Sequence, residues 1–317
     1  MTDVSAGAVA MIAADQLDSA LVRSLTAEFA RRGVVHHAEA ASFTSATGPI
    51  RAVRWWLSLA DSDDDYGTQL INSLLEDAAE QLGGVEHTTT TVLPQQLRSA
   101  GTMMLIMDVD STLIDQEVID ILADHAGRAP EVAAVTERAM RGELDFAESL
   151  HARVQTLTGL PESVLTETFA RITPTAGAED LIGNFNRGGH PVFAVSGGFT
   201  QILAPLAQQL GLTDYAANHL ELTDHQLTGR VEGEVVDRAV KRRRMLQWAN
   251  DHDVDVQNVV AVGDGANDLD MVTSAGVGVS FCAKPALAER ADLIIRHRNL
   301  DLVGYALGLS AKDTDER

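Results

Sequence analysis

Hydrophobic and polar residues follow two different patterns along the chain, and the change falls near residue 100. Before it, short apolar or β-branched runs alternate with stretches whose apolar residues recur every three or four positions. This pattern predicts the order strand, helix, strand, strand, helix, strand over Ala8–Ala14, Leu21–Arg32, Val34–Phe43, Arg51–Leu59, Thr68–Leu82 and Val85–Val92. Such an order is typical of a small α+β βαββαβ domain with two helices on one face of its sheet.

After residue 100 the apolar runs become short, continuous and widely spaced. They predict buried strands over Met103–Met107, Pro191–Val195, Val259–Val262, Val277–Phe281 and Leu293–Ile295. Runs of this kind, separated by helical stretches, favour an α/β fold with a doubly wound parallel sheet. The patterns from Gln116 to Arg171 are all helical and too long for one crossover, so they indicate a helical cap. We therefore expect one domain at 1–95, a second at 100–310, and a cap at about 116–175.

Charge and composition exclude several classes of partner. The 317 residues carry a net charge of −22, with 46 acidic and 24 basic side chains. Such a field repels nucleic acids and anionic membranes, whereas a small anion could bind beside a local cation or metal. The single cysteine, Cys282, excludes an intrachain disulfide framework. The first residues lack the basic and long apolar stretches of a targeting segment, so we expect a soluble cytoplasmic protein.

Two carboxylates, Asp108 and Asp110, directly follow the first predicted strand of the second domain. At this position one can attack an electrophile while the other transfers protons. A calcium-binding EF-hand loop also begins with the pattern D-x-D. That loop needs glycine at its sixth and glutamate at its twelfth position, where this chain has Leu113 and Ile119. The pattern therefore favours catalysis over calcium binding.

A second motif, Ser196-Gly197-Gly198, follows another predicted strand and precedes a helix. Backbone N–H groups at such a turn, together with the serine hydroxyl, can bind an anion. A serine-hydrolase reading is also open, because the motif is one residue away from a nucleophile elbow. Asp264 and His297 follow in the order that a hydrolase of that class would require.

The remaining candidates are a lysine and a second pair of aspartates. Lys241 shares one face of a predicted helix with Met245 and Trp248, so its ammonium should point toward a partner. A side chain in a basic cluster that extends to solvent is the alternative. Asp264 and Asp268 lie four residues apart after a buried strand, on one face of any helix that begins there. Opposite the Asp108 pair, these carboxylates would suit a hard cation such as Mg²⁺.

Together, these segments resemble the haloacid dehalogenase superfamily of phosphatases, and within it the members that hydrolyse phosphoserine. The resemblance covers roughly residues 100–310 and rests on DVDSTL, ITPTAGAEDLI, VSGGFTQI, TGRVEGEVV, AVGDGANDLDM and FCAKP. It implies hydrolysis of a phosphate monoester through an aspartyl-phosphate. By this resemblance Asp108 is the nucleophile and Asp110 the general acid and base. It also implies Mg²⁺ as the cofactor, held by Asp108, Asp264 and the backbone carbonyl of Asp110, with Asp268 near the metal. The residues implied to bind phosphate are Ser196, Gly197, Lys241 and Asn267.

The substrate assignment rests on the cap. The resemblance implies that Glu117 meets the substrate ammonium, that Arg153 meets its carboxylate, and that Met140 and Phe146 wall the pocket. The spacing of Phe146 and Arg153 supports this, because it places both on one face of a helix. We therefore expect phosphoserine as the substrate. A phosphatase or phosphotransferase for another small phosphate ester would differ only in the cap.

The first 95 residues look like the ACT-type amino-acid-binding domains that accompany some members of this family. A glycine usually follows the first strand of those domains, where this chain reads Ala13-Ala14-Asp15-Gln16. An amino-acid effector site and a dimerising role, giving a homodimer, are therefore both open. A non-catalytic amino-acid sensor is the remaining alternative, against which the Asp108 and Asp110 pair argues.

Overall fold

Two β-sheets organise the molecule, which we describe from a computed structural model. It describes residues 7–59, 64–94, 101–140 and 143–309. The predicted boundary at residues 95–100 lies outside these ranges. No helix within them is long and apolar enough to cross a bilayer.

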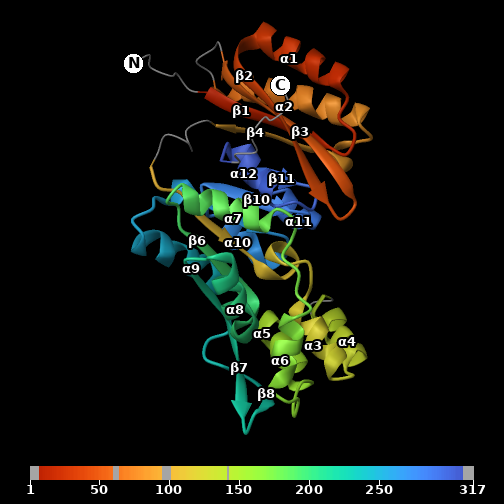
Figure 1. Cartoon of the computed structure of the whole chain (residues 1–317), viewed down its shortest axis with the longest axis vertical. Helices are drawn as coiled ribbons and strands as arrows, with labels where there is room; N and C mark the ends of the chain where they lie inside the picture. Colours follow the sequence, from red (N-terminus) through yellow and green to blue (C-terminus); the bar gives the residue numbers. More distant parts are fainter. Residues whose placement is uncertain (1–6, 60–63, 95–100, 141–142, 310–317) are drawn as a thin grey trace.

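The N-terminal sheet has four antiparallel strands in the order β2-β3-β1-β4. The strands are β1 (Gly7–Ala14), β2 (Gly33–Ser45), β3 (Gly48–Leu59) and β4 (Thr89–Pro94). Two helices, α1 (Ser19–Arg32) and α2 (Asp64–Gln81), cover one face of the sheet (Figure 1). This arrangement confirms the predicted βαββαβ order.

Helix α1 forms where the sequence predicts it, because its capping and its apolar stripe agree. Asp18 caps the helix by accepting a hydrogen bond from the Ala20 N–H at 3.0 Å. Leu25 and Phe29, one turn apart, are buried against the sheet. The ring of Phe29 meets Trp55 of β3 edge-on, with ring centroids 5.1 Å apart.

The second sheet has seven strands in the order β11-β10-β9-β5-β6-β7-β8. All are parallel except β8, which pairs antiparallel with β7. The strands are β5 (Met104–Met107), β6 (Val192–Phe199), β7 (Asp214–Thr223), β8 (Gln226–Glu232), β9 (Val259–Gly263), β10 (Val277–Phe281) and β11 (Leu293–Ile295). The hydrophobic pattern predicts five of them and misses β7 and β8.

Helices cover both faces of this sheet, which confirms the doubly wound α/β fold. They are α7 (Ala178–Arg187), α8 (Thr200–Leu210), α9 (Arg238–Asp251), α10 (Leu269–Val272), α11 (Pro285–Ala288) and α12 (Asp301–Leu307). Successive residues of β5 point to opposite faces, so Leu105 joins one hydrophobic core with Phe185, while Ile106 joins the other with Met245.

Five α-helices lie between β5 and β6 in sequence, and the first four of them form the cap at the lower end of Figure 1. They are α3 (Val118–His125), α4 (Ala129–Met140), α5 (Phe146–Gln155) and α6 (Ser163–Phe169). The β7–β8 hairpin runs down beside them. Leu227 of β8 donates to the Leu160 carbonyl at 2.9 Å and accepts from the Gly159 N–H at 2.8 Å. The hairpin thus joins the cap to the sheet edge.

The second face of the N-terminal sheet packs on α12. The Tyr305 hydroxyl donates to the Glu39 carbonyl at 2.6 Å, and the Tyr305 ring meets Phe43 edge-on. Arg54 is 3% exposed and lies over the Tyr305 ring, 4.3 Å from its centroid, while it pairs with the Glu39 carboxylate at 2.8 Å. Helix α12 therefore covers part of the sheet face that lies opposite α1 and α2.

Candidate active site

The predicted chemical residues meet at the carboxyl ends of three neighbouring strands. Asp108 directly follows β5, Ser196 lies in the carboxyl-terminal half of β6, and Asp264 directly follows β9. These strands are adjacent in the order β9-β5-β6. Because carboxyl ends of parallel strands share one edge of the sheet, segments 156 residues apart in sequence converge there.

Asp108 begins a tight turn of irregular geometry. It is 3% exposed, and its Oδ1 accepts a hydrogen bond from the Val109 N–H at 2.7 Å. Residues Val109–Leu113 form a single wide turn in which Ser111 has a φ of +56°. A side chain rarely adopts this left-handed conformation. The turn brings the next carboxylate, Asp110, back toward the end of β6.

The Asp110 carboxylate is held from two sides. The Ser196 hydroxyl donates to its Oδ2 at 3.1 Å, and the Val118 N–H donates to its Oδ1 at 2.7 Å. Burial raises the pKa of Asp110 to about 7, and the charges of Glu117 and Asp108 act in the same direction. The two hydrogen bonds oppose this shift without cancelling it. A carboxyl group with this pKa can both give and take a proton near neutrality.

Lys241 lies at the centre of the site, as its place on an apolar helix face predicts. Its side chain is fully buried, like those of Met245 and Trp248 on the same helix. Its Nζ is 2.7 Å from Asp108 Oδ1 and 2.7 Å from Asp268 Oδ1. Burial disfavours the ammonium, but the two carboxylates outweigh it and raise the pKa of Lys241 above its usual range. The lysine therefore stays charged.

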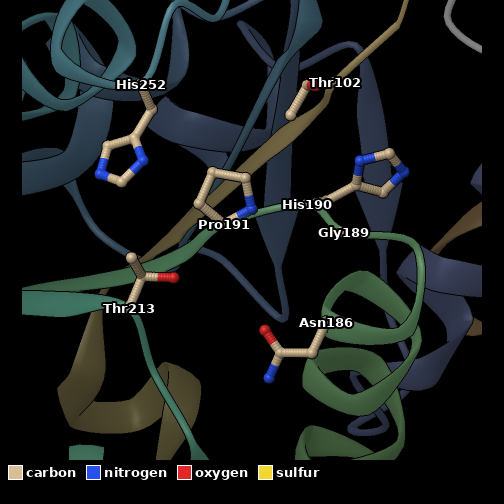
Figure 2. Close-up of a pocket in the computed structure, with 7 residues that line it drawn as sticks. All are labelled: Thr102, Asn186, Gly189, His190, Pro191, Thr213 and His252. Carbon is tan, nitrogen blue, oxygen red and sulfur yellow. The ribbon is translucent and has the colours of Figure 1, made fainter.

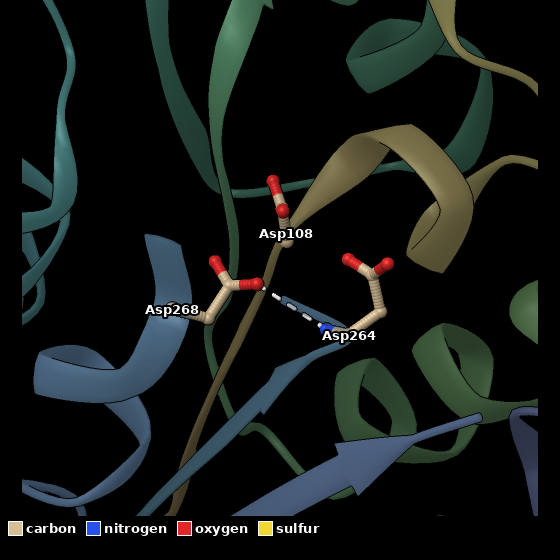
Figure 3. Close-up of side chains that lie close together, drawn as sticks. All are labelled: Asp108, Asp264 and Asp268. Atoms are coloured by element: carbon tan, nitrogen blue, oxygen red, sulfur yellow. Dashed lines mark hydrogen bonds between the residues drawn. The ribbon is translucent and has the colours of Figure 1, made fainter. Parts of the chain in front are cut away.

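Three aspartates form the only cluster of potential metal ligands in the described part of the chain, with ligand atoms within 4.8 Å of one another (Figure 3). They are Asp108, Asp264 and Asp268. The oxygens of Asp268 already have donors: Lys241 on Oδ1, and the N–H groups of Asp264 and Gly265, each at 3.2 Å, on Oδ2. Asp268 therefore fits a supporting position beside a cation better than direct ligation.

Asp264 has the environment of a cation ligand. It is half-buried, and no hydrogen bond from the described residues reaches its carboxylate. Burial raises the pKa of Asp264 to about 6, with the charges of Asp108 and Glu117 acting in the same direction. Asn267, three residues on, donates to Asp108 Oδ2 at 3.2 Å. Crowded carboxylate oxygens of this kind fit a hard divalent cation.

The end of β6 offers backbone and hydroxyl groups beside these carboxylates. The Gly198 N–H donates to Ser196 Oγ at 2.7 Å. Phe146, the first residue of α5 in the cap, lies against this part of β6. A Cβ atom at Gly197 would lie 2.8 Å from Phe146 Cζ, so any other residue there would displace the Phe146 ring.

The cap brings one acid and one base toward the same space. Ser111 Oγ donates to Glu117 Oε1 at 2.7 Å. Desolvation raises the pKa of Glu117 and lowers that of Arg153, and the charge of each side chain partly offsets the shift of the other. The structure thus brings these two predicted residues together. Met140 ends α4, and its side chain lies outside the described part of the chain.

Residues 105–273, just over half of the chain, match the model of the haloacid dehalogenase-like hydrolase family. The chain belongs to this family. The segment contains the three strand-end motifs and the whole cap. The resemblance that the motifs indicate is therefore confirmed.

Individual relatives extend the comparison beyond the family segment. A protein of Streptomyces coelicolor named phosphoserine phosphatase is 44% identical over 273 residues, which are 86% of this chain and 64% of that protein. The chain thus spans less than two thirds of that relative's length. A solved phosphoserine phosphatase with an analogue of a phospho-aspartyl intermediate is 41% identical, with a TM-score of 0.61 over 64% of this chain and 98% of that one.

A second solved structure covers both sheets. It is an unliganded probable phosphoserine phosphatase from Vibrio cholerae, 30% identical, with a TM-score of 0.74 over 95% of this chain and 87% of that one. A likeness of this extent includes the N-terminal sheet. The α+β unit is therefore part of an architecture that this relative shares.

The structure contradicts the serine-hydrolase alternative. Ser196 lies in β6 and His297 follows β11, and three strands lie between β6 and β11 in the sheet. Since neighbouring strands are about 4.8 Å apart, the two side chains cannot form a hydrogen bond. Ser196 Oγ instead donates to Asp110, and His297 Nδ1 lies 3.1 Å from Thr89 Oγ1.

Asn218, a buried residue of β7, belongs to this site and has no motif to reveal it. Its Nδ2 donates to the Gly197 carbonyl at 2.8 Å, and its Oδ1 accepts from the Val236 N–H at 2.8 Å. It therefore joins the carboxyl-terminal part of β6 to the segment that leads into α9 and Lys241. A polar residue at a buried strand position is the one sequence signal for it, and only after β7 is known.

A separate open pocket of about 390 Å³ lies at the opposite end of the sheet (Figure 2). Thr102 lines it two residues before β5, and Pro191 and Thr213 line it directly before β6 and β7. His190 and His252 stand at its sides. Because the carboxylates gather at the other ends of these strands, the pocket has no part in the candidate site.

Proposed function

We propose that this chain is a Mg²⁺-dependent phosphoserine phosphatase that releases serine and phosphate. The observation that carries the proposal is a buried Asp108 held by Lys241 next to Asp110, a carboxyl group with a pKa of about 7. A nucleophile needs a fixed, charged carboxylate, and a general acid needs a proton near neutral pH. The names of the most similar relatives support the substrate.

The reaction proceeds in two displacements at phosphorus. A carboxylate oxygen of Asp108 bonds to phosphorus while the P–O bond to serine breaks, and Asp110 gives its proton to the departing oxygen. The Asp110 carboxylate then takes a proton from water as the water oxygen attacks phosphorus. Phosphate leaves and Asp108 is regenerated. Lys241 stabilises the charge on the transferring group throughout.

The acidic cluster fits Mg²⁺, because its donors are carboxylate oxygens and its three carboxylates outnumber the single ammonium group of Lys241. Asp108, Asp264 and the backbone carbonyl of Asp110 would hold the ion, with Asp268 supporting it. When bound, Mg²⁺ offsets the charge of the phosphate oxygens.

Substrate selection falls to the cap. Glu117 would pair with the ammonium of phosphoserine and Arg153 with its carboxylate, a pairing that a planar guanidinium suits. Phe146 and Met140 would wall the pocket, while Ser196, Gly197, Lys241 and Asn267 would bind the phosphate. A cap over the sheet edge also excludes water before the substrate is seated.

The N-terminal unit serves the enzyme as a regulatory or dimerising domain in this proposal. We assign it to residues 1–95 and the phosphatase domain to 100–310, with the cap at about 116–175. Since α12 covers part of one sheet face, a homodimer would form through the edge of β2 or the α1 and α2 layer. Sedimentation velocity with and without free serine tests both roles.

Phosphate release with and without chelator tests the activity, on phosphoserine, phosphothreonine, a sugar phosphate and an aryl phosphate. We expect Mg²⁺-dependent turnover with a strong preference for phosphoserine, no turnover for Asp108→Asn, and full turnover for the exposed cap control Asp124→Asn. Preference for another ester would leave the proposed mechanism intact and refute the assignment of phosphoserine as the substrate. Turnover by Asp108→Asn at the wild-type rate would refute the mechanism.

A further inference from the structure

The segment Arg296–Asn299, between β11 and α12, contacts the N-terminal sheet. The backbone N–H of Arg296 donates to Thr89 Oγ1 at 3.0 Å, and His297 Nδ1 lies 3.1 Å from the same oxygen. Asn299 Nδ2 donates to the Thr44 carbonyl at 2.8 Å. Strands β4 and β2 therefore fix both ends of this short segment.

Arg298, in the middle of the segment, points the opposite way and holds the turn after Asp108. Its Nη1 donates to the Ser111 carbonyl at 3.0 Å and its Nη2 to the Ile114 carbonyl at 3.1 Å. Its Nε donates to Asp115 Oδ1 at 2.7 Å. A planar guanidinium can make these three contacts at once, and a lysine ammonium cannot reproduce their geometry.

The residues to which Arg298 donates hydrogen bonds form the base of the cap. The two chain segments that connect the cap to the sheet run side by side here, with Asp115 N–H donating to the Thr173 carbonyl at 3.0 Å and Thr175 N–H to the Leu113 carbonyl at 2.9 Å. Arg298 lies across this pair of connections, and its Nη2 is 3.5 Å from Thr175 Oγ1. A change in its position would alter how the cap meets the sheet.

We propose that Arg298 is a positioning residue for the reaction, held in place by the N-terminal sheet. It acts through Ser111, whose left-handed conformation is strained and persists only where its surroundings enforce it. Ser111 in turn orients Glu117, and the same turn sets the direction of Asp110. The N-terminal sheet thus supports catalysis through one short segment of the phosphatase domain.

This inference rests on the proposed function, so one readout must be independent of turnover. Amide hydrogen exchange over residues 109–118, measured in the full chain, reports the turn directly. We expect faster exchange there in Arg298→Ala and in Arg298→Lys. The control Arg290→Gln changes an exposed arginine before β11, and exchange over residues 109–118 should be unchanged in it. Unchanged exchange in Arg298→Ala would overturn the proposal, even if phosphoserine proved not to be the substrate.

Kinetics separate positioning from a purely structural role. We expect kcat to fall about 10- to 100-fold in Arg298→Ala, the range seen when groups that orient a site are removed. The fall should occur with both phosphoserine and an aryl phosphate, since Asp110 serves both. Millimolar guanidinium should restore part of kcat in Arg298→Ala but not in Arg298→Lys. A loss of thermal stability with wild-type kcat would refute positioning.

The link to the N-terminal sheet has its own matched pair of variants. Thr89→Val removes the hydroxyl that contacts Arg296 and His297 with little change in shape. Thr91→Val makes the same change two residues along the same strand, where the buried hydroxyl has no hydrogen-bond partner among the described residues. We expect faster exchange over residues 109–118 and a lower kcat in Thr89→Val alone. Equal behaviour of the two variants would overturn the link.

Discussion

Replacing Lys241 with methionine should destabilise this protein more than any surface charge change. The side chain is fully buried, and its Nζ makes two 2.7 Å contacts, with Asp108 and Asp268. Methionine has a similar volume, so the main consequence is two buried carboxylates without their counter-charge. Breaking a buried ion pair in this way costs about 3–5 kcal/mol of the free energy of unfolding.

Arg238 provides the matched control, because it lies three residues earlier on the same helix. Its ion pair with Asp270 is exposed, and such pairs contribute about 0–1 kcal/mol. We therefore expect Arg238→Met to change the free energy of unfolding by no more than about 1 kcal/mol. Both variants keep the length of the helix and remove one positive charge.

Urea unfolding in the presence of chelator, followed by circular dichroism and by amide exchange of α9, measures both variants. Adding Asp268→Asn to Lys241→Met should recover part of the loss, since it removes one of the two uncompensated charges. Mg²⁺ should also reduce the deficit by offsetting the remaining carboxylates. A loss below about 1 kcal/mol for Lys241→Met in chelator would refute the reasoning that Lys241 neutralises this cluster.

Three further variants test the substrate pocket under the cap, the carboxyl-terminal part of β6, and the contact between the two sheets. Arg153→Gln should raise KM for phosphoserine about 10- to 100-fold, since a hydrogen bond to a charged group contributes about 1.5–3 kcal/mol, while KM for an aryl phosphate, which lacks the carboxylate, stays unchanged. Asn218→Asp removes the donor to the Gly197 carbonyl, so KM should rise for every phosphate ester, and a rise for phosphoserine alone would contradict this. Burial lowers the pKa of His297 below its usual 6.5, so the unfolded chain binds the proton more readily and stability falls as the pH drops below about 6.5. Thermal midpoints of His297→Gln between pH 7.5 and 5.5 should fall less than those of the wild type, and parallel curves would refute this.

The strand-end motifs were predictable because buried parallel strands leave a strong local signal. Each is a continuous apolar run, and Asp108 and Asp264 directly follow two of them. Lys241 was a candidate for a similar reason, since it shares the apolar face of a predicted helix with Met245 and Trp248, and its burial decides between a buried partner and a side chain that extends to solvent. The match to the haloacid dehalogenase-like hydrolase family confirms the fold that these signals indicate.

Strands β7 and β8 escaped prediction because their side chains are mostly half-buried or exposed, so no continuous apolar run marks them. Asn218 was missed with them, since a buried asparagine has meaning only once its strand is placed. The irregular turn after Asp108 was likewise hidden, because the left-handed Ser111 depends on contacts with distant residues rather than on local preference.

The sequence alone determined the order of elements, the doubly wound fold and the residues available for chemistry, because periodicity and motifs are local properties. Which of these residues meet is seen only once the chain is folded. The tertiary structure pairs Lys241 with both Asp108 and Asp268, and it separates Ser196 from His297. It also places Arg298 between the N-terminal sheet and the base of the cap, a contact between segments more than 180 residues apart. Such contacts depend on strand order and packing, which no short stretch of sequence encodes.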